Sequence, residues 1–333
     1  SDKVQEGPNR LELRFESPVR AIKEMERKSP TKYHSTVESA RPFIRKAQYS
    51  YGWDWGPRIT QVGLWRSVYI ELSDDVKIVN PFCYTERLEE GLARLRISAQ
   101  VEVIKDTPLE AEVIVSFGDV VETRVPVRLQ ERGGAYRIDS TIDITHPRLW
   151  YPNGMGEQPL YEIAIRVSSQ GHLMDETRFR SGIRVVKLIQ ERDEEGRTFI
   201  LEINGHRLFA KGANWVPADN LLPRLSKDDY YRYVKLAKDA NMNMLRVWGG
   251  GIYEDTAFYE ACDDMGIMVW QDFMYSCAQY PDDLEWFQKE AAREAECIVK
   301  SLRNHPAIVL WCGNNENNWG FVDWWGDGDP EYK

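Results

Sequence analysis

Apolar and polar residues alternate along several short segments in the first 187 residues of the chain. Residues 95–103, 111–115 and 161–167 show the pattern most clearly, and residues 11–15 and 67–72 repeat it. Alternation with period two places one face of a strand in a core and the other in water, which is typical of antiparallel sheets. Short strands separated by turn residues favour β-sandwiches. This part of the chain is therefore predicted to be mostly β-structure.

A polar seam at residues 73–75 divides this β-rich part into two predicted domains. Residues 75–187 have the size of one immunoglobulin-like β-sandwich. Residues 1–74 are few for a jelly-roll β-sandwich, so we expect a partial one that lacks its first strands.

The pattern changes after residue 187, where apolar residues recur every three or four positions in three segments. Such spacing predicts amphipathic helices. The first begins at Ser226, which forms a variant of the capping box with Asp229. The second ends at Gly266, a residue type that commonly closes a helix. The third covers residues 284–302.

Short apolar runs between these helices predict buried strands at residues 244–248, 267–270 and 307–311. One earlier strand is expected at either 199–203 or 207–211. Alternating strands and helices are typical of parallel α/β folds. Four strands are half of a (β/α)8 TIM barrel. We therefore expect a multidomain protein in which residues 188–333 form the first half of a barrel.

The predicted parallel strands end in polar or aromatic residues, and such ends converge on one face of a barrel, where catalytic groups gather. Glu316 follows the last strand, beside Asn315. The nearby tryptophans are Trp311, Trp319, Trp324 and Trp325. An apolar surround raises the pKa of a carboxyl group, so Glu316 is a candidate general acid.

Each of these strand-end residues also has an ordinary structural interpretation. Arg246 could pair with a core carboxylate, Asp272 could cap the next helix, and Trp248 could pack in a core. Glu316 could lie in a solvated loop. The three glycines at 249–251 lack the spacing and the lysine of a phosphate-binding loop.

The sequence Trp-Asp-Trp-Gly-Pro at residues 53–57 is a second unusual stretch. Tryptophan rings stack on sugar faces, and Asp54 could accept hydrogen bonds from sugar hydroxyl groups. The alternative is an aromatic cluster at a domain junction. Twelve tryptophans in 333 residues make the sugar interpretation worth testing, although most of them are expected to fill cores.

Composition excludes several other classes of protein. A net charge of −10 without a basic cluster argues against binding to nucleic acid or to an anionic membrane. No apolar run has the length of a membrane span, and the opening residues lack the apolar segment of a signal peptide. Five scattered cysteines form neither a zinc motif nor a disulfide framework. We expect a cytoplasmic protein without metal or cofactor, and the oligomeric state is not predicted.

Glycosidases place two carboxylates across the scissile bond. Glu316 fits the acid/base role, and no second candidate is evident between it and Lys333. The partner is therefore expected on a later strand beyond Lys333.

These residues together resemble the β-mannosidase branch of glycoside hydrolase family 2, and the resemblance covers nearly the whole chain. The Gly-Leu-Trp-Arg and Asn-Glu motifs are shared with β-galactosidases and β-glucuronidases of that family, whereas the motifs at 53–56 and 246–251 point to the mannosidase branch. The matching stretches are residues 51–57, 63–66, 211–215, 243–254, 270–273 and 313–317.

The resemblance implies retaining, exo-acting hydrolysis of terminal β-D-mannose residues, with a β-mannoside as the partner molecule. Glu316 would be the acid/base, Asn315 would bind the sugar 2-hydroxyl, and Arg246 would support the nucleophile. The remaining substrate contacts implied by the resemblance are Trp53, Asp54, Trp248, Asp272 and Trp324. The isolated chain is expected to be inactive, since it would lack the nucleophile.

Two alternatives remain open at this point. A related family 2 exo-glycosidase (a β-glucosaminidase, β-galactosidase or β-glucuronidase) would share most of the motifs. A non-catalytic carbohydrate-binding assembly would use only the β-domains.

Overall fold

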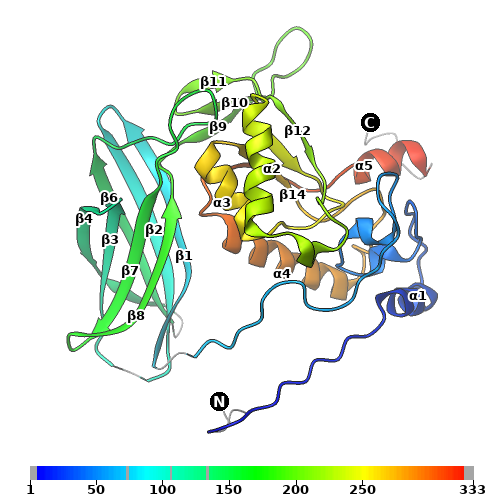
Figure 1. The fold of residues 1–333 in the computed structure, drawn as a ribbon, viewed down its shortest axis with the longest axis horizontal. Helices are drawn as coiled ribbons and strands as arrows, with labels where there is room; N and C mark the ends of the chain where they lie inside the picture. The colour runs from blue at the N-terminus through cyan, green and yellow to red at the C-terminus, as the bar shows by residue number, and fades with distance from the viewer. Residues whose placement is uncertain (1–5, 73–74, 106, 133–134, 326–333) are drawn as a thin grey trace.

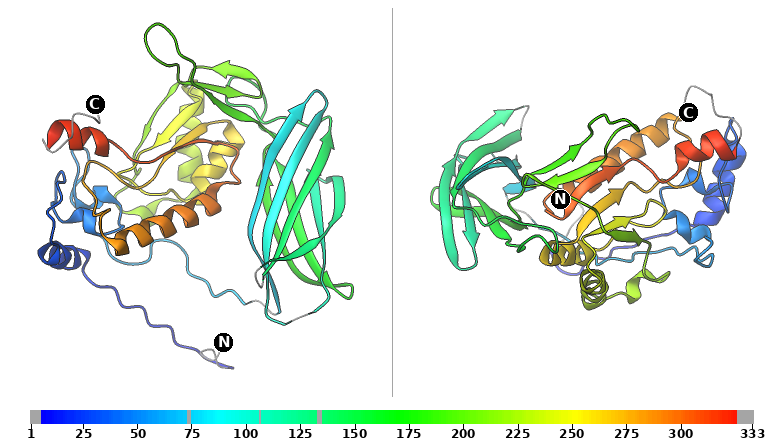
Figure 2. Two further views of the ribbon diagram at one scale, coloured as in Figure 1. Left: turned by 180° about the vertical axis from the view of Figure 1, so that it is seen from behind. Right: turned by 90° about the horizontal axis from the view of Figure 1, so that it is seen from above.

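The structure is a computed structural model that describes residues 6–72, 75–105, 107–132 and 135–325. We call its three larger parts the N-terminal segment (residues 6–72), the β-sandwich (76–181) and the α/β region (212–325); a small sheet lies between the last two in sequence. The β-sandwich and the helices of the N-terminal segment lie on opposite sides of the α/β region (Figure 1, Figure 2).

The N-terminal segment contains helices but no strand among its described residues. Helix α1 (Pro18–Lys28) begins where the Ser17 side chain accepts a hydrogen bond from the Arg20 backbone N–H. Pro18 suits the first turn because its missing N–H would have no partner there. Two 3-10 helices follow, η1 (Arg41–Phe43) and η2 (Gln48–Tyr51).

The strands predicted at residues 11–15 and 67–72 are wrong, so the partial jelly roll expected here has no sheet within the described residues. Both segments lack regular structure, and the Leu72 side chain is 84% exposed. Alternation encodes a strand only where a neighbouring strand satisfies the backbone groups and covers the apolar face. Residues 73 and 74 of the predicted seam lie outside the described residues.

The β-sandwich consists of two four-stranded antiparallel sheets, as the alternating segments predicted. Along β2, Ala93, Leu95 and Ile97 point into the core, whereas Arg94 and Arg96 point outward and pair with acidic residues of β6. One sheet contains β1 (Val76–Glu89), β2 (Leu92–Val103), β6 (Ala135–Thr145) and β5 (Leu129–Arg132). The other contains β4 (Val120–Val127), β3 (Glu110–Phe117), β7 (Tyr161–Ser169) and β8 (His172–Ser181).

A small antiparallel sheet follows the sandwich and corrects the prediction of the first barrel strand. Its strands, in spatial order, are β11 (His206–Leu208), β10 (Ile200–Ile203) and β9 (Val186–Ile189). The two alternatives for the first parallel strand, 199–203 and 207–211, fall on β10 and β11, so both are wrong. Asn204 and Gly205 connect them with positive φ angles of 50° and 83°. An Asn-Gly pair in this conformation makes a tight hairpin, which forces an antiparallel neighbour.

The α/β region is a four-stranded parallel sheet with helices between its strands, in the predicted alternation. The capping box of Ser226 with Asp229 and the left-handed Gly266 at the end of α3 are confirmed. Its strands are β12 (Gly212–Trp215), β13 (Met244–Val247), β14 (Met268–Asp272) and β15 (Ile308–Cys312). Its helices are η3 (Leu222–Arg224), α2 (Lys227–Asp239), α3 (Thr256–Met265), α4 (Glu285–Leu302), α5 (Asn317–Trp319) and the π-helix η4 (Gly320–Trp324).

Apolar side chains of α2 and α3 pack with those of the parallel strands into one core. This core is joined to the β-sandwich by Trp150, whose indole N–H donates to the Asp263 carbonyl at 2.9 Å. Arg184 donates to the carbonyls of Pro306 and Ile308, just before and within β15. These contacts fix the start of β15 and hence the position of the residues that follow it. Among the described residues, no helix combines the length and the apolar character that crossing a bilayer requires.

Candidate active site

Polar side chains from all four parallel strands meet at the C-terminal edge of the sheet. Asn214 lies on β12, Arg246 on β13 and Asp272 on β14, and Asn315 and Glu316 follow β15. Parallel strands end on the same edge, so residues distant in sequence become neighbours there. The predicted convergence of strand ends is therefore observed for these five side chains.

Arg246 connects three of the other strand ends. Its Nε and Nη2 atoms donate to the two carboxylate oxygens of Asp272 at 3.2 and 2.7 Å, a bidentate geometry that fixes the guanidinium plane. Nη2 also donates to Asn315 Oδ1 at 2.9 Å. Nη1 donates to Asn214 Oδ1 at 3.3 Å. The interpretation that Arg246 pairs with a core carboxylate is thus correct, and that carboxylate belongs to the site.

The Asp272 carboxylate is fully enclosed, with a side-chain exposure of 0%. The Gly249 backbone N–H donates to Oδ2 at 3.0 Å, in addition to the two bonds from Arg246. Burial raises the pKa of Asp272, and Arg246 opposes that rise. The interpretation of Asp272 as a helix cap is wrong, because α4 begins thirteen residues later with Leu284 at its N-cap. Both oxygens accept hydrogen bonds, so Asp272 orients Arg246. Its predicted role as a substrate contact stays a prediction.

Asn315 is a buried connector between Arg246 and Glu316. Its Oδ1 accepts the bond from Arg246, and its Nδ2 donates to Ser276 Oγ at 3.1 Å and to Glu316 Oε2 at 3.1 Å. Its backbone is also held, because Cys277 N donates to Asn315 O at 3.0 Å and Asn315 N donates to Tyr275 O at 2.9 Å. The amide therefore has a fixed orientation beside the carboxylate.

The two oxygens of Glu316 have different surroundings. Oε2 accepts hydrogen bonds from Asn315 Nδ2 at 3.1 Å and from the Cys277 thiol at 3.3 Å. Oε1 has no hydrogen-bond partner among the described residues, and the side chain is exposed. The backbone of Glu316 is in the left-handed region at φ 60°, which is uncommon for a residue with a Cβ and frequent at functional sites. One oxygen is thus anchored and the other is available to a ligand.

The predicted tryptophan enclosure of Glu316 is wrong within the described residues. Trp319 and Trp324 are 56% and 42% exposed, and their ring centroids lie 5.8 Å apart. Trp311 stacks on Phe273 instead. Trp324, a predicted substrate contact, lies at the end of the short helix η4. A run of tryptophans in sequence does not enclose a neighbour when the chain turns into a short exposed helix.

Trp53 of the N-terminal segment packs against Trp248, which follows β13. Their ring centroids are 4.9 Å apart at an interplanar angle of 73°, and the Trp55 ring lies 5.9 Å from Trp248. The alternative interpretation, an aromatic cluster where two parts of the chain meet, is therefore observed, and the sugar-binding interpretation stays a prediction. Asp54 lies between the two tryptophans in sequence, is exposed, and makes no hydrogen bond or ion pair to another described residue. Both sequence neighbours of Asp54 thus contact Trp248, the residue that follows β13.

Two residues of this site carried no recognisable signal in the sequence. Cys277 lies in the loop after β14 and contacts Glu316 through its thiol. Arg41 lies in the N-terminal segment and donates to the carbonyls of Ser276 and Cys277 at 2.9 and 2.8 Å. A cysteine without a motif and a lone arginine more than 200 residues away cannot be connected by spacing alone.

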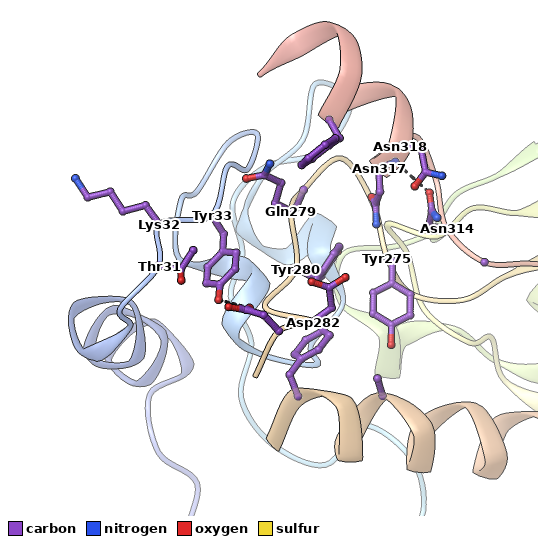
Figure 3. A pocket seen from close by; sticks show the side chains of 16 residues that line it. Thr31, Lys32, Tyr33, Tyr275, Gln279, Tyr280, Asp282, Asn314, Asn317 and Asn318 are labelled. Carbon is purple, nitrogen blue, oxygen red and sulfur yellow. Dashed lines mark hydrogen bonds between the residues drawn. The ribbon is translucent and has the colours of Figure 1, made fainter. Parts of the chain in front are cut away.

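A cavity of about 540 Å³ lies beside the Glu316 loop, between α4, α5 and the N-terminal segment (Figure 3). Asn314 and Asn317, which flank Glu316 in sequence, line it, whereas Glu316 does not. Aromatic rings of Tyr33, Tyr275 and Tyr280 form other parts of its wall. Within the described ranges, no group of three or more histidine, cysteine or acidic side chains is arranged to hold a metal ion.

Two family comparisons match the chain. Residues 1–66 match the family described as "Glycosyl hydrolase 2 galactose-binding domain-like". Residues 76–184 match the family described as "Glycosyl hydrolases family 2". The second match covers the β-sandwich and the three residues that follow it.

The chain is also similar to named relatives and solved structures. β-Mannosidase B of Emericella nidulans is 36% identical over 98% of this chain and 39% of that protein. A crystal structure of a β-D-mannosidase from Dictyoglomus thermophilum is 41% identical with a TM-score of 0.89, over 95% of this chain and 39% of that chain. An exo-chitosanase structure from Amycolatopsis orientalis, at 20% identity and a TM-score of 0.57 over 72% of this chain and 28% of that chain, shares the fold. The chain therefore spans about two-fifths of the length of the curated relatives it matches.

Proposed function

The chain belongs to glycoside hydrolase family 2, and we propose that it forms part of a retaining, exo-acting β-mannosidase. The reaction would remove terminal β-D-mannose residues from the non-reducing ends of β-mannosides. We use "full-length enzyme" for a protein that carries this chain and has the length of its relatives. The names of the relatives at 36% and 41% identity support the mannoside specificity.

The observation that carries the proposal is the asymmetric Glu316 carboxylate at the end of a parallel strand. Oε2 is held by Asn315 and Cys277, and Oε1 is free among the described residues. A glycosidase acid must protonate the leaving oxygen and then, as a base, activate water from the same position. A carboxylate with one anchored oxygen and one free oxygen satisfies this requirement, because the proton can leave and return without a change of rotamer.

In the proposed mechanism, protonated Glu316 donates its proton through Oε1 to the glycosidic oxygen as the bond from that oxygen to the anomeric carbon breaks. A second carboxylate forms a bond to the anomeric carbon, and Glu316 then accepts a proton from the water that displaces it. Asn315 remains the predicted partner of the sugar 2-hydroxyl, since its Oδ1 accepts one bond from Arg246 and retains a second lone pair.

Arg246 is proposed to support the second carboxylate. Its guanidinium is already oriented by Asp272, and its side chain is 24% exposed, so one edge faces the open side of the site. We do not assign the role of second carboxylate to Asp272, because its side chain is fully enclosed. We propose that the nucleophile is supplied by another part of the full-length enzyme, at about 5–5.5 Å from Glu316, the separation typical of retaining glycosidases.

Trp53, Asp54, Trp248 and Trp324 are proposed to form the walls of the sugar pocket. The contact of Trp53 with Trp248 supports this role for the first three, because it joins the segment that carries Asp54 to the residue after β13. A wall from the N-terminal segment would block the far end of the pocket and make the enzyme exo-acting.

The architecture is proposed on the same basis. Residues 75–187 would be an immunoglobulin-like domain, and the four parallel strands would be the first half of a (β/α)8 barrel. The N-terminal segment would belong to a jelly-roll sugar-binding domain, as its family match to residues 1–66 supports.

The proposal is tested by the activity of the full-length enzyme on a panel of aryl β-glycosides with mannose, glucosamine, galactose and glucuronic acid. We expect turnover of the mannoside at least about 10²-fold above the others, a ratio that a pocket with dedicated hydroxyl partners can reach. Proton NMR of the first-formed sugar should show the β-anomer. Preference for another glycoside would establish a different family 2 specificity, and first formation of the α-anomer would exclude retention.

The non-catalytic alternative is tested by mannose binding. Binding that is unchanged when residues 188–333 are deleted would favour a carbohydrate-binding assembly. Binding that is lost in both Trp53→Ala and Glu316→Gln would favour the enzyme.

A further inference from the structure

Arg41 is a buried cation without an acidic partner among the described residues. Its side chain is fully enclosed, with 0% exposure, and burial lowers its pKa. A charge removed from water is costly unless many hydrogen bonds compensate it. Each of its three nitrogens donates to protein oxygens: the Thr36 carbonyl at 3.0 Å and hydroxyl at 3.1 Å, the Gln48 side chain, and the carbonyls of Ser276 and Cys277 at 2.9 and 2.8 Å.

These bonds clamp the loop that supports Glu316. The carbonyls of Ser276 and Cys277 belong to the loop after β14, and the same loop bridges to Asn315 through backbone hydrogen bonds. Thr36 N also donates to the Cys277 carbonyl at 3.2 Å. The N-terminal segment thereby contacts the loop after β14 at Cys277, the residue whose side chain reaches Glu316.

Cys277 transmits this contact to the carboxylate. It is held in the left-handed region at φ 47°, a costly conformation for a residue with a side chain. Its thiol donates to Glu316 Oε2 at 3.3 Å and accepts from Ser276 Oγ at 3.4 Å. Burial raises the pKa of the Cys277 thiol, so it stays protonated and remains a donor at neutral pH.

We propose that Arg41 and Cys277 act as a positioning relay for Glu316. Arg41 holds the backbone of Cys277, and the Cys277 thiol fixes Oε2 so that Oε1 alone faces the leaving oxygen. Neither residue touches substrate, and the inference rests on the proposed acid/base role of Glu316. It goes beyond that role because it makes acid catalysis depend on a buried arginine of the N-terminal segment.

The relay is tested in the full-length enzyme with two substrates that differ only in the leaving group. 2,4-Dinitrophenyl β-D-mannoside needs little help from an acid, whereas phenyl β-D-mannoside depends on it. We expect Arg41→Met and Cys277→Ala each to lower kcat/KM on the phenyl mannoside about tenfold, the effect of one lost hydrogen bond. On the dinitrophenyl mannoside we expect less than about a twofold change in kcat/KM, which reports the step in which the leaving group departs.

Arg66 provides a matched control. It also lies in the N-terminal segment and caps two consecutive carbonyls, those of Tyr253 and Glu254 at 2.9 and 2.7 Å, but in the loop after β13. Arg66→Met should therefore change the rates on both substrates by the same factor. A leaving-group-selective loss in Arg66→Met would show that any loosened contact of the segment has this effect, and would overturn the specific assignment.

Two further comparisons separate the relay from a structural role. The double variant Arg41→Met/Cys277→Ala should lose no more than the stronger single variant, because both act through the same hydrogen bond. Additive losses, or equal losses on both substrates, would overturn the proposal. If Arg41→Met does not fold, Cys277→Ala with an unchanged Tm carries the test alone. Should Glu316→Gln lower kcat/KM equally on both substrates, the proposed function fails and the relay with it. A loss of kcat/KM confined to the phenyl mannoside in Glu316→Gln but absent in Cys277→Ala refutes only the relay.

Discussion

Asn315 holds the carboxylate of Glu316 in place through a hydrogen bond to Oε2. The Asn315 amide is fixed by Arg246 on one side and Ser276 on the other, so its remaining N–H points to Glu316 Oε2. This arrangement resists rotation of the carboxylate more than any single bond would. A side chain that must donate and then recover a proton benefits from such restraint.

Glu254, which has no proposed role in catalysis, shows how burial alone changes the pKa of a carboxyl group. Its side chain is almost fully enclosed, and it accepts a hydrogen bond from the Trp215 indole at 2.9 Å. Burial raises the pKa of Glu254 from 4.5 to about 7. The folded state therefore holds this proton more tightly than the unfolded chain, so the stabilising contribution is complete below about pH 4.5 and is lost as the pH rises through about 7.

Glu254→Gln should remove this pH dependence. We expect the free energy of unfolding of the wild type, relative to the variant, to fall by roughly 3 kcal/mol between pH 4.5 and pH 8. The measurement is the denaturation midpoint of both proteins across that range. A constant difference between the two proteins at every pH would contradict the raised pKa.

Secondary-structure elements in this chain depend on the neighbours that pair with them. Residues 67–72 alternate as cleanly as β2 does, yet they form no strand among the described residues because no partner lies beside them. β10 and β11 fit the length of a barrel strand, yet the Asn204-Gly205 turn pairs them antiparallel. In both cases the neighbouring strand decides whether a segment becomes a strand and in which kind of sheet. The alternation within the segment does not specify that neighbour.

β12 and β13 approach each other closely at Gly212. A Cβ added at this glycine would lie 1.8 Å from the Met244 carbonyl oxygen, which is backbone and cannot move aside without opening the ladder. Gly212→Ala is therefore expected to lower the free energy of unfolding by more than about 2 kcal/mol, as overpacking does. Chemical denaturation measures the change.

Gly313→Ala is the control for that substitution, because a Cβ there meets nothing within 4 Å. Its stability should be unchanged or slightly higher, by up to about 1 kcal/mol. Equal destabilisation of the two variants would mean that the close contact at Gly212 is not the cause.

Elements with their own local signals were predictable, and so were residues placed by those elements. The Ser226–Asp229 capping box and the Gly266 stop fixed helix ends, and apolar runs fixed three of the four parallel strands. The sequence also predicted that Arg246, Asp272 and Asn315 belong to the site, because the ends of parallel strands must converge. It did not predict the contact of Arg41 with Cys277, because that contact depends on how the N-terminal segment docks, and docking has no local sequence pattern.

The whole molecule brings distant parts of the chain to one edge of the parallel sheet. Arg45 of the N-terminal segment pairs with Glu294 of α4 through two bonds of 2.7 and 2.9 Å, and Trp53 of the same segment packs on Trp248. Arg184, just after the last strand of the β-sandwich, fixes the start of β15 from the other side. Acid catalysis as proposed therefore depends on three parts of the chain, although the proton-bearing side chain belongs to one.

The most direct measurement of this account is the leaving-group dependence of Glu316→Gln in the full-length enzyme. Gln keeps the contacts to Asn315 and Cys277 but cannot donate the proton. We predict that kcat/KM on phenyl β-D-mannoside falls by more than about 10²-fold, whereas kcat/KM on 2,4-dinitrophenyl β-D-mannoside, which reports only the departure of a good leaving group, changes far less. Turnover of the phenyl mannoside close to that of the wild type would contradict the assignment of Glu316 as the acid/base.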